Sequence, residues 1–263
     1  MNQIPNMLTL CNLFCGCCAI VCALGNHYNE AFYFFCGGFF FDAADGPVAR
    51  KMGISSEMGK ELDSLADMVT FGVLPGIIMY ILLIKSFGFG GDAANIRHGA
   101  IEALNYKALP AFLIPVFACY RLAKYNLDTR QSDVFLGLAT PASTTFVVGL
   151  MLIYANNTTF MGNMEIDDAG NIKSLGDIIM KPYLLYGIIA ILCFLQISEL
   201  PLMKFRMKNY SIKGNEMRYA FLALLVIGLI LFKEAVFAFG VLAYIACSLV
   251  HNFMVVNREN GNT

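Results

Sequence analysis

Residues 42–67 read DAADGPVARKMGISSEMGKELDSLAD and place four aspartates between long apolar flanks. The chain around this stretch has 263 residues, of which 58% are hydrophobic and only 14% are charged. Because a soluble domain carries about 25% charged residues, this composition predicts a membrane protein, and it excludes a disordered chain. The net charge of −1 provides no basic field for nucleic acid, so we expect no nucleic-acid partner.

Apolar runs of the length that crosses a bilayer, about 20 residues, recur along the whole chain. We therefore expect an all-α fold, a polytopic membrane helix bundle with about eight transmembrane helices. The expected spans lie near residues 7–25, 30–50, 60–85, 107–127, 138–155, 180–199, 218–233 and 234–255. We further expect three parts: a membrane core over 1–200, a basic cytosolic loop over 201–217, and a C-terminal transmembrane hairpin and tail over 218–263.

The positions of lysine and arginine predict the orientation, because these residues concentrate on the cytosolic side. With a cytosolic N-terminus, twelve of the 18 Lys and Arg residues fall inside and six fall outside. Both termini are then cytosolic. The junction of the second and third spans, which carries the aspartates, faces the cytosol as well. The basic loop 201–217 is suited to anchoring on anionic head groups.

The aspartates follow helical spacing on both sides of a short polar turn. The first run is Asp42, Asp45, Gly46 and Ala49, and the second is Gly59, Asp63 and Asp67. Each run covers roughly one helix face. An aspartate at the centre of a membrane helix costs about 2.5–3.5 kcal/mol, and clustered carboxylates also repel one another. Divalent cations remove both problems, and ligation by carboxylates alone suits Mg²⁺ or Mn²⁺.

Small and cationic residues share the same helix faces as the aspartates. Gly46, Ala49 and Gly59 leave space beside the carboxylates, and Arg50 adds a fixed positive charge. Metal ions, an arginine and a cleft together describe a site for a diphosphate. A single aspartate here would be an ordinary solvated helix end, but four in one frame with glycine and arginine point to a site.

At these positions the sequence resembles the CDP-alcohol phosphotransferase family, whose signature is D-x2-D-G-x2-A-R-x8-G-x3-D-x3-D. The matching residues are Asp42, Asp45, Gly46, Ala49, Arg50, Gly59, Asp63 and Asp67, with every spacing intact. Shorter strings, PNMLTLCNL at 5–13, RLAKYN at 121–126 and FLGLATPAS at 135–143, resemble the phosphatidylserine synthase branch of that family. Lys124 and Tyr125 depart from the Arg and Phe common there. The resemblance covers roughly residues 1–150.

The resemblance implies transfer of a phosphatidyl group from CDP-diacylglycerol to L-serine, giving phosphatidylserine and CMP. By the family pattern, Asp42, Asp45, Asp63 and Asp67 share two divalent ions, and Asp67 is the catalytic base for the serine hydroxyl. The same pattern implies that Gly46, Ala49 and Gly59 make room for the CDP moiety, with Arg50 near its diphosphate. It also implies a homodimer. We expect an integral protein of the cytoplasmic (inner) membrane, in contact with membrane lipids, whose active site faces the cytosol.

Three residues of the fourth expected span are further candidates for substrate binding. Arg121 and Lys124 lie at its cytosolic end and could bind the lipid phosphate or the serine carboxylate. Their alternative role as cytosolic anchors is equally compatible with the sequence. Asn126 is a polar contact at the same level.

Two alternatives stay open at the level of the sequence. The first is the same chemistry with another acceptor, such as glycerol 3-phosphate, inositol phosphate, inositol or choline, since the aspartate motif does not select the alcohol. The second is an ion-coupled transporter, because carboxylates within the membrane also mark ion pathways. Transporters usually carry duplicated halves, and we find no second copy of the aspartate motif.

Overall fold

The computed structural model of the chain describes residues 4–53, 56–88, 106–127, 135–156, 165–166, 172–173, 175–202 and 216–260. Its long helices are α1 (Ile4–Leu24), α2 (Tyr28–Lys51), α3 (Glu57–Asp67), α4 (Leu74–Ser86), α6 (Leu113–Leu127), α7 (Thr140–Ala155), α9 (Pro182–Ile197), α10 (Glu216–Phe232) and α11 (Val236–Asn260). Shorter helical elements are the π-helix η1 (Met68–Val73), the 3₁₀ helices η2 (Leu109–Phe112) and η3 (Lys233–Ala235), and α8 (Leu175–Ile179). Two small antiparallel pairs join β1 (Phe135–Leu136) to β4 (Pro201–Leu202) and β2 (Glu165–Ile166) to β3 (Ile172–Lys173).

A helix occupies each of the ranges expected from the sequence, and the predicted all-α membrane bundle is confirmed. Three helical stretches are long and apolar enough to cross a membrane, namely Ile4–Leu24, Glu57–Ser86 and Lys233–Val250, and shorter apolar helices accompany them. The number of spans and the side of the membrane on which the termini lie stay predictions. Of the expected basic loop 201–217, residues 203–215 lie outside the described part of the chain.

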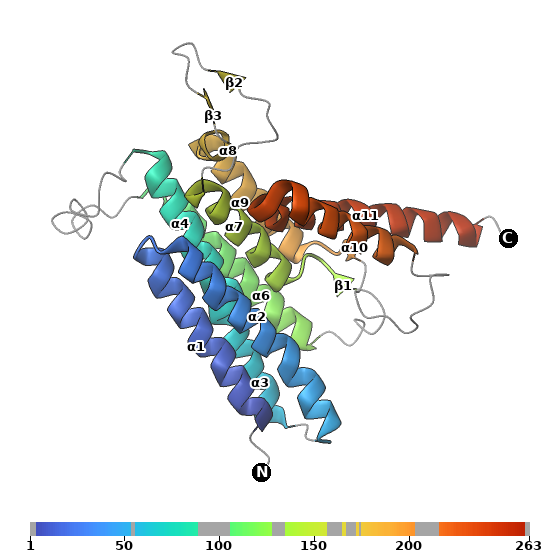
Figure 1. The fold of residues 1–263 in the computed structure, drawn as a ribbon. Coiled ribbons are helices and arrows are strands. Elements are labelled where there is room, and N and C mark those ends of the chain that lie inside the picture. The colour runs from blue at the N-terminus through green and yellow to red at the C-terminus, as the bar shows by residue number, and fades with distance from the viewer. Residues whose placement is uncertain are drawn as a thin grey trace.

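The central helices of the bundle are α4 and α7, and α1, α2, α6 and α9 lie around them (Figure 1). On α4 the side chains of Leu74, Ile78 and Leu82 have no more than 1% exposure. Helix α7 is buried along most of its length, from Thr140 to Ile153. A helix that is apolar on every side belongs in the centre of a bundle. In contrast, α1 and α2 bury one face each and expose the other.

Small residues bring α1, α2 and η1 close together. A Cβ added at Gly16 would collide with Thr70 of η1, and one at Gly38 would lie 3.0 Å from Thr70 Cγ2 and 3.1 Å from Asn12 Oδ1. Glycine at such contacts lets membrane helices approach to backbone distance. The close approach places polar side chains of α1 within reach of the helices that carry the aspartates.

The predicted third span is interrupted by the π-helix η1, which begins immediately after Asp67. A π-helix widens the backbone ring and leaves carbonyl groups without their usual partners. Here the Thr144 hydroxyl of α7 donates to the carbonyl oxygen of Phe71 at 2.9 Å. The Thr70 hydroxyl donates to the carbonyl oxygen of Asn12 at 3.2 Å. These bonds fix η1 between α1 and α7, and with it the orientation of Asp67.

The C-terminal pair, α10 and α11, points in a different direction from the N-terminal helices, and α11 lies against α7 (Figure 1). The turn between the two helices has Lys233 in the left-handed region, with φ of 46°. A Cβ at Gly149 of α7 would collide with the backbone of Ala238, so this glycine lets α11 approach α7 directly. The expected C-terminal hairpin is therefore packed onto the core by backbone contact.

Candidate active site

Three carboxylates converge where the C-terminal half of α2 faces α3. Asp42 of α2 and Asp63 and Asp67 of α3 each offer an oxygen atom, and these atoms all lie within 4.8 Å of one another. The helical spacing predicted this convergence, because Asp63 and Asp67 are one turn apart on the same face of α3. Like charges at such distances repel strongly unless protons or cations intervene.

Asp45 lies beside this group rather than within it. Its side chain is buried, and its Oδ2 accepts a hydrogen bond from the hydroxyl of Thr9 on α1 at 2.7 Å. The sequence predicted that all four carboxylates would share one site, and the structure brings only Asp42, Asp63 and Asp67 into the closest cluster. The hydrogen bond from Thr9 holds the Asp45 side chain beside the adjoining pocket, which Asp45 lines.

Helix α1 also supplies a partner for Asp67. The Asn12 side chain is fully buried, and its Nδ2 donates to Asp67 Oδ1 at 3.1 Å. Sequence reasoning gave no role to Thr9 or Asn12, although both lie in the quoted stretch 5–13. The available signal was two polar side chains, three residues apart on one face of an otherwise apolar helix, since such residues in a membrane need polar partners.

A pocket of about 590 Å³ opens next to the carboxylates. It is lined by Pro5, Asn6, Thr9, Asp45, Gly46, Ala49, Arg50, Gly53, Ser56, Gly59, Lys60 and Asp63. A Cβ at Gly59 would lie 2.9 Å from Ser56 Oγ and 3.2 Å from Asn6 Oδ1, so a larger residue would narrow the pocket. The structure thus brings Gly46, Ala49, Arg50 and Gly59 into the lining of one pocket, together with Asp45 and Asp63.

Local signals in the sequence explain where α2 ends and where α3 begins beside this pocket. Helix α2 ends at Lys51, and Gly53 follows two residues later with φ of +67°, which suits glycine just beyond a helix C-terminus. Helix α3 begins after Ser56, whose hydroxyl accepts a hydrogen bond from the backbone N–H of Gly59 at 3.0 Å. This N-cap starts α3 at the register that turns Asp63 and Asp67 toward α2.

The donor set fits a hard divalent cation. Asp63 Oδ1 is buried and has no hydrogen-bond partner among the described residues, although it belongs to the three-carboxylate group. A buried carboxylate oxygen without a partner is costly, and a cation would satisfy it. All the ligand atoms are carboxylate oxygens, which Mg²⁺ and Mn²⁺ prefer. The cluster of Asp42, Asp63 and Asp67 could therefore hold a metal ion.

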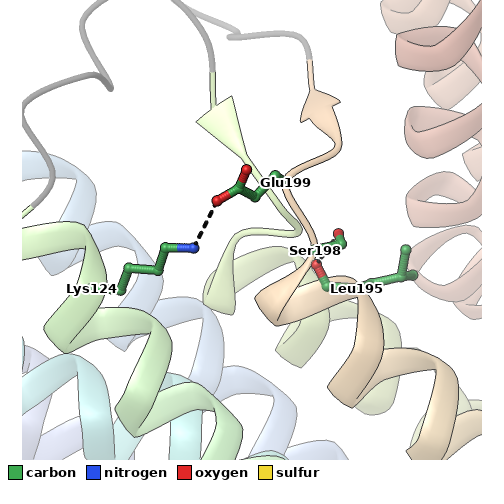
Figure 2. A network of polar contacts seen from close by, with 4 residues as sticks. All are labelled: Lys124, Leu195, Ser198 and Glu199. Atoms are coloured by element: carbon green, nitrogen blue, oxygen red, sulfur yellow. Dashed lines mark hydrogen bonds and ion pairs between the residues drawn. The ribbon is translucent and has the colours of Figure 1, made fainter.

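The three candidates from α6 have separate environments, and none of them lines the pocket. Lys124 Nζ pairs with Glu199 Oε1 at 3.2 Å, at the end of α9 (Figure 2). Asn126 Nδ2 donates to Ser64 Oγ of α3 at 2.8 Å. The backbone oxygen of Asn126 accepts from Lys60 Nζ at 3.2 Å, and Lys60 does line the pocket. Arg121 is buried, with 8% of its side chain exposed.

A family model for CDP-alcohol phosphatidyltransferases matches residues 2–194, which include α1, both acidic helices and α6. The chain belongs to the CDP-alcohol phosphatidyltransferase family. The resemblance found in the sequence is therefore confirmed at the level of the family.

Two curated proteins are similar in sequence to this chain. A CDP-diacylglycerol–serine O-phosphatidyltransferase of Bacillus subtilis is 34% identical over 154 residues, which cover 59% of this chain and 78% of that protein. One of Helicobacter pylori is 33% identical over 175 residues, which cover 65% of this chain and 67% of that protein.

Proposed function

We propose that this CDP-alcohol phosphatidyltransferase transfers the phosphatidyl group of CDP-diacylglycerol to L-serine and releases CMP. The observation that carries this proposal is the convergence of Asp42, Asp63 and Asp67 beside a pocket that Asp63 and Arg50 line. The acceptor follows from the relatives in Bacillus subtilis and Helicobacter pylori, whose names specify serine.

In this proposal Asp42, Asp45, Asp63 and Asp67 hold two divalent ions, Mg²⁺ or Mn²⁺. When bound, such ions neutralise the diphosphate and stabilise the leaving nucleotide. Asp42, Asp63 and Asp67 supply the close cluster, and Asp45 supplies a carboxylate on the pocket side. The fit rests on the unpartnered Asp63 oxygen and on an all-carboxylate donor set.

The residues of this chain divide the work of the reaction. Arg50, on the pocket wall, binds the diphosphate with its guanidinium group. Gly46, Ala49 and Gly59 leave the space that the CDP moiety fills. Asp67 accepts the proton of the serine hydroxyl as the serine oxygen bonds to the lipid-side phosphorus. The bond from that phosphorus to the bridging oxygen breaks, and CMP leaves with both electrons.

Positioning supplies much of the rate, because an aspartate is a weak base toward an alcohol. The hydrogen bond from Asn12 fixes one oxygen of Asp67 and so orients its carboxylate. The bonds that hold η1 to α1 and α7 keep Asp67 at the depth of Asp63 and Asp42.

We place the pocket at the cytosolic face of the cytoplasmic membrane. Lys and Arg are in excess on that side of the predicted topology. There the acyl chains of the donor stay in lipid, while serine and CMP exchange with water. The same proposal includes the division of the chain into a membrane core over 1–200, a basic loop over 201–217 and a C-terminal hairpin and tail over 218–263. It also includes a homodimer, which is expected from the family resemblance.

Reconstituting the purified protein in vesicles that contain CDP-diacylglycerol tests the acceptor. With Mg²⁺ or Mn²⁺ and a panel of alcohols, we expect phosphatidylserine and CMP to form in equal amounts from serine, and little product from glycerol 3-phosphate, inositol or choline. Preferential use of another alcohol in this assay would refute serine as the acceptor while leaving the family chemistry intact.

A further inference from the structure

Two cationic side chains line the pocket, and neither has an acidic partner. Arg50 comes from the end of α2, and Lys60 comes from the first turn of α3. Within the described part of the chain, neither side chain forms an ion pair. Asp45 and Asp63 also line the pocket, and the proposed divalent ions neutralise their charge. The two remaining cations suit an anionic ligand that carries more than one charge.

The guanidinium group of Arg50 lies over a glycine of its own helix. A Cβ added at Gly46, one turn earlier on α2, would lie 3.4 Å from Arg50 Nη1 and 3.7 Å from Nη2. Both residues line the pocket. The missing side chain at Gly46 therefore leaves room for the planar end of Arg50, which contributes the first cation of the pocket.

The ammonium group of Lys60 is held in place by a different helix. Its Nζ donates to the backbone carbonyl oxygen of Asn126 at 3.2 Å. Asn126 is the last residue but one of α6, and carbonyl groups in the last turn of a helix lack a partner within the helix and favour a cation. An ammonium group has three donors, and this bond uses one of them. Lys60 can therefore keep its bond to α6 while it donates to a phosphate oxygen in the pocket.

A second contact joins the same two helices without the ammonium group of the lysine. Asn126 Nδ2 donates to Ser64 Oγ at 2.8 Å, and the Ser64 hydroxyl donates to the carbonyl oxygen of Lys60 at 3.1 Å. Ser64 lies one turn after Lys60 on α3. If Lys60 served only to hold α3 to α6, loss of the Ser64 bond would have an effect of the same kind.

The family signature leaves position 60 open, because it lies among the three unspecified residues between Gly59 and Asp63. The signature thus provides one cation, Arg50, for a diphosphate that carries a negative charge on each phosphate group. We propose that Lys60 is the second cation that binds the diphosphate of the CDP-activated lipid, with its ammonium group oriented by the Asn126 carbonyl. This inference rests on the proposed function and adds a donor-binding residue that the family pattern does not specify.

Binding of CDP to the purified, detergent-solubilised protein tests the assignment. The calorimetric titration contains Mg²⁺ but no acceptor, so nothing turns over. The variants are Lys60→Met and Lys60→Arg. Two controls accompany them: Ser64→Ala removes the second contact between α3 and α6, and Lys51→Met removes an exposed lysine at the end of α2 that does not line the pocket. A thermal melt of each variant identifies any loss of folding.

We expect the Kd for CDP to rise about 10- to 100-fold in Lys60→Met, which is the effect of losing one charge-assisted hydrogen bond. Lys60→Arg should keep most of the affinity, because it retains the charge. Ser64→Ala and Lys51→Met should bind CDP as the wild-type protein does. In vesicles, the KM for CDP-diacylglycerol should rise in Lys60→Met while the KM for serine stays the same.

An unchanged Kd for CDP in folded Lys60→Met would overturn the assignment. Equal losses of affinity in Lys60→Met and Ser64→Ala would also overturn it, because Lys60 would then act only by holding α3 to α6. Both results leave the proposed function in place. Failure of the wild-type protein to bind CDP, or to form phosphatidylserine from serine in vesicles, would instead overturn the proposed function.

Discussion

Asp67 is the residue on which proton transfer in the proposed reaction depends. Replacing it with Asn keeps the size of the side chain and removes the base, so transfer should fall by about 10²- to 10⁴-fold. Binding of CDP-diacylglycerol should persist, because Asp67 does not line the pocket. Product formation and donor binding, measured on the same preparation, separate the two effects. Glu61→Gln, an exposed acid on the same helix, is the control, and turnover near wild type in Asp67→Asn would rule out the base assignment.

Asn12 acts on the reaction through Asp67. Its amide donates to Asp67 Oδ1 at 3.1 Å and is fully buried. Groups that orient catalytic or metal-binding carboxylates typically change activity or metal affinity by about 10–100-fold when removed. We expect Asn12→Leu to lower kcat by that factor and to raise the Mg²⁺ concentration needed for half-maximal activity. A kinetic titration with Mg²⁺ measures both, and a variant with normal kcat and normal metal dependence would show that the bond has no role in orientation.

Among the structural elements, η1 depends on the close approach of α1. A Cβ at Gly16 would collide with Thr70, whose hydroxyl bonds to the carbonyl oxygen of Asn12. Overpacking at such a contact costs about 1–3 kcal/mol. We expect Gly16→Val to melt at a lower temperature and to lose activity, because α1 then moves away from Asp67. Gly187→Ala is the matched control, since a Cβ there meets nothing within 4 Å. Equal melting temperatures in the two variants would contradict the packing role of Gly16.

The same elements show which features of the site could be predicted from the sequence and which could not. The spacing of the aspartates indicates which helix face each one occupies. It predicted the cluster of Asp42, Asp63 and Asp67 because residues at i and i+4 share a face of a helix whatever surrounds them. The bond from Asn12 to Asp67 joins residues 55 apart in the chain, and no local periodicity encodes it. Nor does any local pattern mark the π-helix after Asp67, which is fixed by hydrogen bonds from α1 and α7.

For the whole molecule, composition was sufficient to predict an all-α membrane bundle and the approximate place of each helix. It could not predict which helices lie side by side, because apolar spans are nearly interchangeable until their small and polar residues are matched across interfaces. For Lys124 the sequence left a substrate ligand and a cytosolic anchor equally open. In the structure its Nζ pairs with Glu199, 75 residues away, at 3.2 Å. Arg121, three residues earlier, is buried, and its Nε–H has no acceptor within the part of the chain that the structure describes.

Loss of the divalent metal should affect the whole bundle as well as catalysis. The three carboxylates join α2 to α3, and their mutual repulsion is relieved only when cations or protons bind. A ligand that binds the folded state alone stabilises it by about 2.7 kcal/mol at a hundred times its dissociation constant. We therefore expect a chelator to abolish transfer and to lower the melting temperature, and Mg²⁺ or Mn²⁺ to restore both. A thiol-reactive dye can follow the melt, because the chain has nine cysteines and no tryptophan. Asp63→Asn should lose most of the thermal shift with Mg²⁺, whereas Glu61→Gln should keep it. A full shift in Asp63→Asn would mean that the cation binds elsewhere, and the carboxylate cluster would then need another explanation.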